Sequence, residues 1–206
     1  MPPVRFCHFL WIVRVLPVGR FLNISPQQPG LGGRCVCQSA VPAQGGVACL
    51  AAYNNGRLHG AWIEATTPDE IRAGVSAMLA ASPEPDAEEW AIHDYEGFQG
   101  ASLSEYAAFE TVCDLADFLG EHGEVGAKLY RHFGDDLEQA RAAFEDYAGE
   151  YRSAADFAEE FMRETGTEIP PSLDYYIDWT ALARDMALNG EIMVFQTGFD
   201  EVHVFW

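Results

Sequence analysis

The sequence predicts an α+β fold of three small units in a row, and three observations carry this prediction. Short alternating apolar runs in the first half of the chain and at its C-terminus are typical of strands, whereas residues 104–165 show the longer apolar period of helices. Glycines and prolines interrupt both patterns at short intervals, which limits the size of each unit. Hydrophobic residues make up 49% of the 206 residues, so the chain can bury a core and is not a disordered acidic segment.

The first unit, predicted over residues 47–103, opens with two strands. The segments 47–53 and 58–65 flank an Asn-Asn-Gly sequence at residues 54–56. Asn and Gly tolerate the positive φ that hairpin turns require. The pattern therefore predicts a β-hairpin.

A helix and a third strand complete the first unit as a β-β-α-β arrangement. Thr67 and Glu70 have the spacing of a capping box, with Pro68 at the first helical position. A helix is therefore predicted from residue 68 to about residue 81, and its buried face is Ile71, Val75, Met78 and Leu79. Two prolines end this helix, and residues 89–95 predict the third strand.

The middle unit, predicted over residues 104–150, is a helical layer. Its apolar residues recur at helical spacing and are Tyr106, Phe109, Val112, Cys113, Leu115, Ala116 and Leu119. Glycines at positions 120, 123, 126, 134 and 149 divide the region into short helices of roughly ten to fifteen residues.

The third unit, predicted over residues 151–206, combines helices with a C-terminal hairpin. Ser153 has the position of an N-cap for a helix that carries Phe157, Phe161 and Met162. An Asn-Gly pair ends a second helix over residues 178–188. Strands are predicted over residues 191–196 and 201–206, and alternation places on one face Val202, Val204 and Trp206.

The first 46 residues differ in composition from the rest. They contain no acidic residue and four arginines, Arg5, Arg14, Arg20 and Arg34. Arginine and proline interrupt the apolar stretch 6–24, so it fits neither a membrane-spanning helix nor a signal peptide. Two interpretations stay open: a start site placed too early, with residues 1–46 disordered or untranslated, or an arm that binds a membrane or a partner.

The two parts of the chain also differ in net charge. Residues 47–206 hold all 32 Asp and Glu residues against eight Lys and Arg, a net charge of −24. Such a chain repels nucleic acid and anionic membranes, so we expect no direct contact with either.

Some of these carboxylates are predicted to form stripes. Glu110, Asp114, Asp117 and Glu121 are spaced 4, 3 and 4, and a second set at i, i+4 spacing is Asp156, Glu160 and Glu164. Like charges at this spacing cost about 0.2–0.5 kcal/mol per pair. Two explanations fit: the acidic bias of a salt-adapted proteome, or mimicry of DNA, because 24 charges at about 1.7 Å each match roughly twelve base pairs of duplex.

Sequence motifs for nucleotide binding, zinc proteolysis or serine hydrolysis are absent from the chain. His93 and Asp94 would point to opposite faces of a strand. The acidic run 135–138 lacks the ligand spacing of an EF-hand and fits a helix N-terminus better. We therefore predict no enzyme, no catalytic residue, no metal site and no cofactor. The five cysteines show no disulfide pattern, which favours a cytoplasmic protein.

Several segments, in order, resemble the ArdA-type antirestriction proteins. The longest are residues 49–62 (CLAAYNNGRLHGAW), 89–98 (EWAIHDYEGF) and 198–206 (GFDEVHVFW). Shorter ones are residues 104–106 (SEY), 109–110 (FE), 146–151 (DYAGEY) and 177–179 (IDW). The resemblance covers essentially residues 47–206. It departs from the family at Lys128 and at residues 44–46, where Gln-Gly-Gly stands in place of strand residues, so the resemblance implies a first strand that is short or mispaired.

The resemblance implies a non-catalytic DNA mimic from a mobile genetic element such as a plasmid, elongated, of three small domains, and homodimeric. Its partner would be the DNA-binding groove of a type I restriction–modification enzyme. The carboxylates expected to replace phosphates are Glu110, Asp114, Asp117, Glu121, Glu124, Asp135, Asp136, Glu138, Glu145, Asp146, Glu150, Asp156, Glu159, Glu160 and Glu164. Aromatic residues suited to a dimer contact are Tyr147, Tyr151, Tyr175, Tyr176, Trp179 and Phe199. The alternative is an acidic adaptor or chaperone that binds basic proteins.

Overall fold

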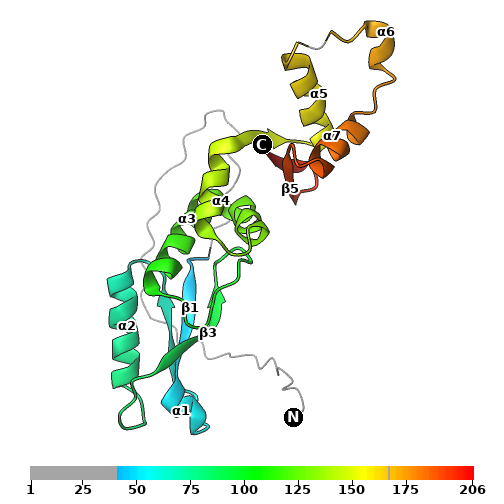
Figure 1. Cartoon of the computed structure of the whole chain (residues 1–206). Coiled ribbons are helices and arrows are strands. Elements are labelled where there is room, and N and C mark those ends of the chain that lie inside the picture. Colours follow the sequence, from blue (N-terminus) through cyan, green and yellow to red (C-terminus); the bar gives the residue numbers. More distant parts are fainter. Residues whose placement is uncertain (1–40, 167) are drawn as a thin grey trace, which may run out of the picture. The chain divides into compact units, whose positions relative to one another are not determined.

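Two three-stranded antiparallel sheets and seven α-helices make up the described part of the chain, which confirms the α+β class (Figure 1). A computed structural model describes residues 41–166 and 168–206. The segment 1–40, and with it most of the predicted N-terminal extension, lies outside the described residues. Among those described, no helix is both long and apolar enough to cross a membrane.

The first sheet has the strand order β2-β1-β3. Its strands are β1 (Gln44–Cys49), β2 (Gly60–Glu64) and β3 (Trp90–Glu96). The central strand β1 is six residues long, and Gly45 pairs with Ile63 on one side and Tyr95 on the other. The expectation that residues 44–46 shorten this strand is therefore wrong, although a bulge at Gly46/Val47 shifts its register against β3.

The tight turn predicted for the hairpin over residues 47–65 is also wrong. The chain leaves β1 at Cys49 and forms the short helix α1 (Leu50–Asn54), whose Ala52 is fully buried. Leucine and alanine favour a helical turn here, and a short apolar run does not distinguish strand from helix. Gly56 does have the positive φ that its sequence predicts, at +72°, but it follows a helix and not a strand.

Helix α2 (Pro68–Ala80) forms where the capping box predicts it. The Thr67 hydroxyl accepts a hydrogen bond from the Glu70 amide at 3.3 Å, which satisfies one of the free N–H groups of the first turn. Ile71, Val75 and Met78 are buried as predicted, and the helix packs beside β2 (Figure 1).

The middle of the chain forms α3 (Phe109–His132) and α4 (Leu137–Ala143). Gly123, with φ 57° and ψ −139°, breaks α3 into two shorter helical segments, as the glycine pattern predicts, whereas Gly120 and Gly126 stay helical. Tyr106 was predicted on its buried face, but it lies before the helix and is 68% exposed. Residues 101–108 form a loop, and α3 begins only after it, three residues beyond Tyr106.

The second sheet has the order β4-β6-β5, and its first strand was missed. A 3-10 turn, η1 (Phe144–Asp146), leads into β4 (Tyr147–Tyr151), where the sequence predicted helix to residue 150. The partner of β4 is β6 (Glu201–Phe205), about fifty residues later in the chain, so no local pattern marks the strand. Strand β5 (Met193–Gly198) completes the predicted C-terminal hairpin with β6.

Three further helices lie between these strands, namely α5 (Ala154–Glu164), α6 (Pro171–Asp174) and α7 (Trp179–Leu188). Ser153 caps α5 by accepting from the Asp156 amide at 3.1 Å, and Asp178 caps α7 in the same way. Helix α5 therefore begins where its cap predicts, and α7 begins one residue after the predicted start at residue 178.

The buried side chains form two clusters that meet at β6 from opposite faces. Val202 and Val204 belong to a cluster with Phe157 of α5, as their alternation predicts. Phe205, on the other face, belongs to the larger cluster, which also holds buried residues of the first sheet, α2, α3 and α4. Strand β6 is therefore covered on both faces.

Candidate functional site

The carboxylates of this chain all lie at the surface. None of the 32 Asp and Glu side chains is buried, and all are exposed except for four half-buried ones, Glu84, Asp136, Glu159 and Asp174. Thirteen of the fifteen carboxylates predicted to replace phosphates are exposed, and the other two are Asp136 and Glu159. These side chains are therefore available to a partner.

The first acidic stripe lies on α3, before the break at Gly123. Glu110, Asp114, Asp117 and Glu121 are all exposed, whereas the other side of this half-helix buries Val112, Leu115, Phe118 and Leu119. No lysine or arginine occurs in this half of α3. Two arginines from other helices reach the stripe. The Arg72 guanidinium of α2 lies 3.4 Å from the Glu110 carboxylate, and Arg141 of α4 donates to the backbone carbonyl of Asp114 at 3.1 Å.

A buried thiol next to this stripe responds to its negative potential. Burial raises the pKa of the Cys113 thiol, and the charges of Asp117, Asp114 and Glu110 raise the same pKa further. A negative charge disfavours the thiolate because two like charges would lie close together. The charges of these three carboxylates therefore add up at the position of Cys113.

A second group of acids surrounds the end of α3 and the start of α4. Asp136 accepts hydrogen bonds from the Gln139 amide at 3.0 Å and from the Gln139 side chain at 2.7 Å, which lower the pKa of its carboxyl. It thereby opens a helix, as its sequence predicts. Asp135 accepts from the Ser102 hydroxyl at 2.8 Å. Glu124 is partly neutralised, because the Lys128 ammonium lies 2.9 Å from it.

The third group follows β4 and the exposed face of α5. Asp156, Glu160 and Glu164 lie one turn apart on α5, beside a shallow depression of about 470 Å³. Burial raises the pKa of the nearby Tyr151 hydroxyl, and Glu160 and Glu164 raise it further. Glu159 differs from the rest, because Arg163 lies 2.7 Å from it. Exposed carboxylates also occur at η1 and β4, at Glu145, Asp146 and Glu150.

The six aromatic residues proposed for a dimer contact fall into two sets. Tyr175, Tyr176 and Phe199 are 91%, 79% and 93% exposed and are free to contact a partner. Tyr151 instead packs on Phe157, and Arg163 lies over the half-buried ring of Trp179. The Tyr147 hydroxyl hydrogen-bonds to His203 at 2.8 Å. The last three therefore have partners within their own chain.

His203 and Glu201 of β6 form a small polar network with Thr197 of the neighbouring strand β5. The Thr197 hydroxyl donates to the Glu201 carboxylate at 2.7 Å, and Nε2 of His203 lies 3.5 Å from the same carboxylate. These two groups lower the pKa of Glu201 below its ordinary value of 4.5. The lowered pKa means that the ionised carboxylate stabilises the fold.

We expect Glu201→Gln to lower the melting temperature at pH 7. A carboxylate whose pKa is lowered by folding stabilises the protein above its ordinary pKa and loses that contribution as the pH falls through the folded pKa. The difference in melting temperature between Glu201→Gln and the wild type should therefore shrink below pH 4.5. Thermal melts from pH 7 to about pH 3 measure it, with the exposed Glu191→Gln as control. A difference that stays constant over this range would contradict the network.

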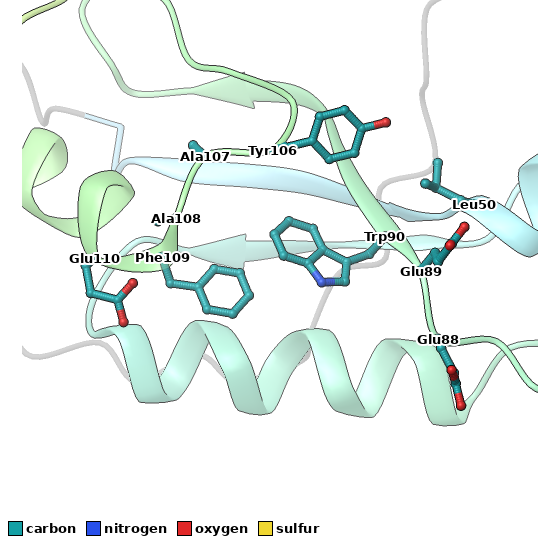
Figure 2. Close-up of a pocket in the computed structure, with 9 residues that line it drawn as sticks. All are labelled: Leu50, Glu88, Glu89, Trp90, Tyr106, Ala107, Ala108, Phe109 and Glu110. Carbon is teal, nitrogen blue, oxygen red and sulfur yellow. The ribbon is translucent and has the colours of Figure 1, made fainter.

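One depression on the surface was not predicted (Figure 2). It has a volume of about 650 Å³, and its lining includes Trp90 and Phe109, whose rings stack with centroids 4.9 Å apart. Tyr106, which the sequence placed in a core, lies at its edge. Its lining comes from three separate segments of the chain, so no single pattern identifies it. A tryptophan directly after two glutamates, Glu88 and Glu89, is the one local signal.

No group of three or more His, Cys, Asp or Glu side chains in residues 41–166 and 168–206 lies close enough together to hold a metal ion. Cys49 and Cys113 are buried free thiols. The candidate functional site is the set of exposed carboxylates on α3, α4, β4 and α5.

Comparison with known proteins agrees with this description. The sequence model of one protein family, described as "Antirestriction protein (ArdA)", matches residues 47–201. The match includes β2, β3 and all seven α-helices, and it spans each of the fifteen carboxylates proposed above. A search of curated protein sequences gave no match.

Proposed function

Because the chain belongs to the ArdA family of antirestriction proteins, we propose that it binds a type I restriction–modification enzyme in place of DNA. Occupation of the enzyme's DNA-binding groove would protect incoming unmodified DNA from cleavage. The protein acts without catalysis in this proposal, in the cytoplasm where the restriction enzyme meets the DNA. The observation that carries it is that no carboxylate group is buried in a chain segment of charge −24.

Charge density supports mimicry of duplex DNA. Duplex DNA carries one negative charge per about 1.7 Å of its axis, so 24 charges correspond to about 40 Å or roughly twelve base pairs. The carboxylates on α3, α4, β4 and α5 take the part of phosphates in this proposal. Because many of them act together, no single carboxylate dominates binding.

Long-range attraction should also speed the encounter with a basic groove. Opposite potentials on two proteins raise the association rate and lose that effect as salt screens them. The Debye length is about 8 Å at physiological ionic strength. Inhibition should therefore weaken as salt is added, in parallel with the enzyme's affinity for DNA.

The test is cleavage of unmodified DNA by a purified type I restriction enzyme while the full chain is titrated in at fixed salt. Disordered polyglutamate of equal net charge is the control. Inhibition near stoichiometric amounts by the chain alone would support shape-specific mimicry. No inhibition across several type I enzymes would overturn the proposal and favour the acidic adaptor, whose mark is salt-sensitive binding to many basic proteins.

We also propose that the protein acts as a homodimer. Tyr175, Tyr176 and Phe199 expose large aromatic surfaces that are favoured in interface cores. Two-fold pairing would double the mimicked length to roughly 24 base pairs. Light scattering at micromolar concentration tests this, and a mass of one chain at every concentration would remove the dimer from the proposal.

A further inference from the structure

The depression around Trp90 has an aromatic floor and acidic ends (Figure 2). Trp90 of β3 and Phe109 of α3 stack with an interplanar angle of 22° and form the floor. Glu88 and Glu89 lie at one end of the ring pair and Glu110 lies at the other. The depression therefore combines a π-surface with three carboxylates.

Two of these carboxylates have no cation of their own. Among the described residues, no lysine, arginine or histidine side chain lies within 4 Å of Glu88 or Glu89. Both side chains are exposed. Their negative charge is consequently available to an outside group that enters the depression.

The same chain shows which group such a surface holds. Arg163 lies over the ring of Trp179 at 6.0 Å while its guanidinium pairs with Glu159 and Asp174. Arg72 lies over the ring of Phe109 at 5.7 Å and pairs with Asp69 and Glu110. In both cases an aromatic ring and two carboxylates bind one arginine.

We propose that the depression around Trp90 receives an arginine side chain from the restriction enzyme. This inference rests on the proposed function and adds to it a specific contact between the first sheet and the start of the α3 stripe. A planar guanidinium stacks on aromatic faces and pairs with carboxylates at its edge. Tryptophan gives the strongest attraction to a cation within about 6 Å of its ring.

Charge decides between this occupant and others. A nucleotide could stack on Trp90, but its phosphate would be repelled by Glu88, Glu89 and Glu110. A purely apolar side chain would leave Glu88 and Glu89 without a partner. Arginines are abundant in grooves that bind DNA phosphates, so the proposed partner supplies the required group.

A first experiment tests the depression without any enzyme. The full chain, labelled with ¹⁵N, is titrated with N-acetylarginine amide and, separately, with the uncharged citrulline analogue. The Trp90 indole resonance is identified by its loss in Trp90→Phe. We expect the arginine compound to shift this resonance and the citrulline compound to leave it in place. Equal shifts from both compounds, or none from either, would overturn the proposal.

A matched pair of variants shows whether the two acidic ends matter. Glu88→Gln/Glu89→Gln should reduce the shift of Trp90 at a given arginine concentration by more than half. Glu168→Gln/Glu191→Gln removes the same charge from exposed positions elsewhere and should leave the shift nearly unchanged. Equal reductions in both variants would mean that total charge attracts arginine, and the proposed site would be wrong.

A second experiment tests the partner. In the cleavage assay, Glu88→Gln/Glu89→Gln should raise the concentration needed for half-inhibition by about tenfold, because the variant loses the ion pairs that hold the arginine over the ring. The control variant Glu168→Gln/Glu191→Gln should stay close to the wild type. An equal effect of both variants would overturn the contact with the enzyme. If the wild type itself fails to inhibit, the proposed function fails, and the enzyme is excluded as the source of the arginine. The titration with N-acetylarginine amide still decides whether the depression binds an arginine side chain.

Discussion

Reversing Asp114, Asp117 and Glu121 to lysine should abolish inhibition of a type I restriction enzyme. These side chains lie on one exposed face of α3 before Gly123, where the helix has no positive residue of its own. In the proposed complex this face lies against a basic groove. Three new like-charge contacts would replace three attractive ones, so the concentration needed for half-inhibition should rise on the order of a hundredfold or more.

Single changes should have little effect if mimicry is distributed over many groups. Asp117→Asn removes one charge from a segment of net charge −24 and should change half-inhibition by less than about twofold. The control for the triple reversal is Glu168, Glu191 and Asp200 to lysine. It changes net charge by the same amount at exposed positions outside the proposed surface. Equal losses in the two triple variants would show that only total charge matters.

Stability separates this effect from misfolding. Like charges at i, i+4 spacing cost about 0.2–0.5 kcal/mol per pair, and the reversed stripe would instead place lysines near Glu110. The thermal midpoint of the triple variant should therefore equal or exceed that of the wild type. Loss of inhibition together with a lowered midpoint would attribute the effect to folding and contradict a binding role for these carboxylates.

Elements with a local chemical signal could be predicted from the sequence. The capping residues Thr67, Ser153 and Asp178 mark the starts of α2, α5 and α7, because a side-chain oxygen accepts from an amide three residues later. The α3 stripe was likewise predictable, since spacings of 4, 3 and 4 fix one face on any helix. These features depend on residues close together in sequence.

Features that depend on distant residues could not be predicted. Strand β4 forms because Tyr151 pairs with Val202 and Glu150 with His203, and nothing near residue 150 indicates that pairing. Helix α1 was predicted as strand because a five-residue apolar run fits both. The depression around Trp90 requires α1, β3 and the loop before α3 to meet. The carboxylates of the site were therefore predictable, and the depression was not.

We expect Phe205→Ala to cause the largest loss of stability of any change argued here. Phe205 is completely buried on β6, the central strand of its sheet. Its ring lies 4.9 Å from Tyr147, 5.3 Å from Phe144 and 5.8 Å from Phe195, measured between ring centroids. Truncation of a buried phenylalanine to alanine costs about 3–5 kcal/mol, because lost burial and an unfilled cavity add together.

A matched control lies six residues earlier in the same hairpin. Phe199 is 93% exposed in the β5–β6 turn, and Phe199→Ala makes the same chemical change where no cavity results. Its free energy of unfolding should stay within about 0.5 kcal/mol of the wild type. Urea unfolding followed by circular dichroism, at one fixed protein concentration, measures both variants.

The size of this effect bears on function through the fraction of folded protein. Domains are stable by about 5–15 kcal/mol, so a loss of 3–5 kcal/mol is a large share of the total. Phe205 contacts the aromatic residues between α4 and β4, so its loss should disturb the backbone that carries Glu145, Asp146 and Glu150. If Phe205→Ala and Phe199→Ala shifted the urea midpoint equally, the cluster on this face of β6 would not be the structural core that its burial indicates.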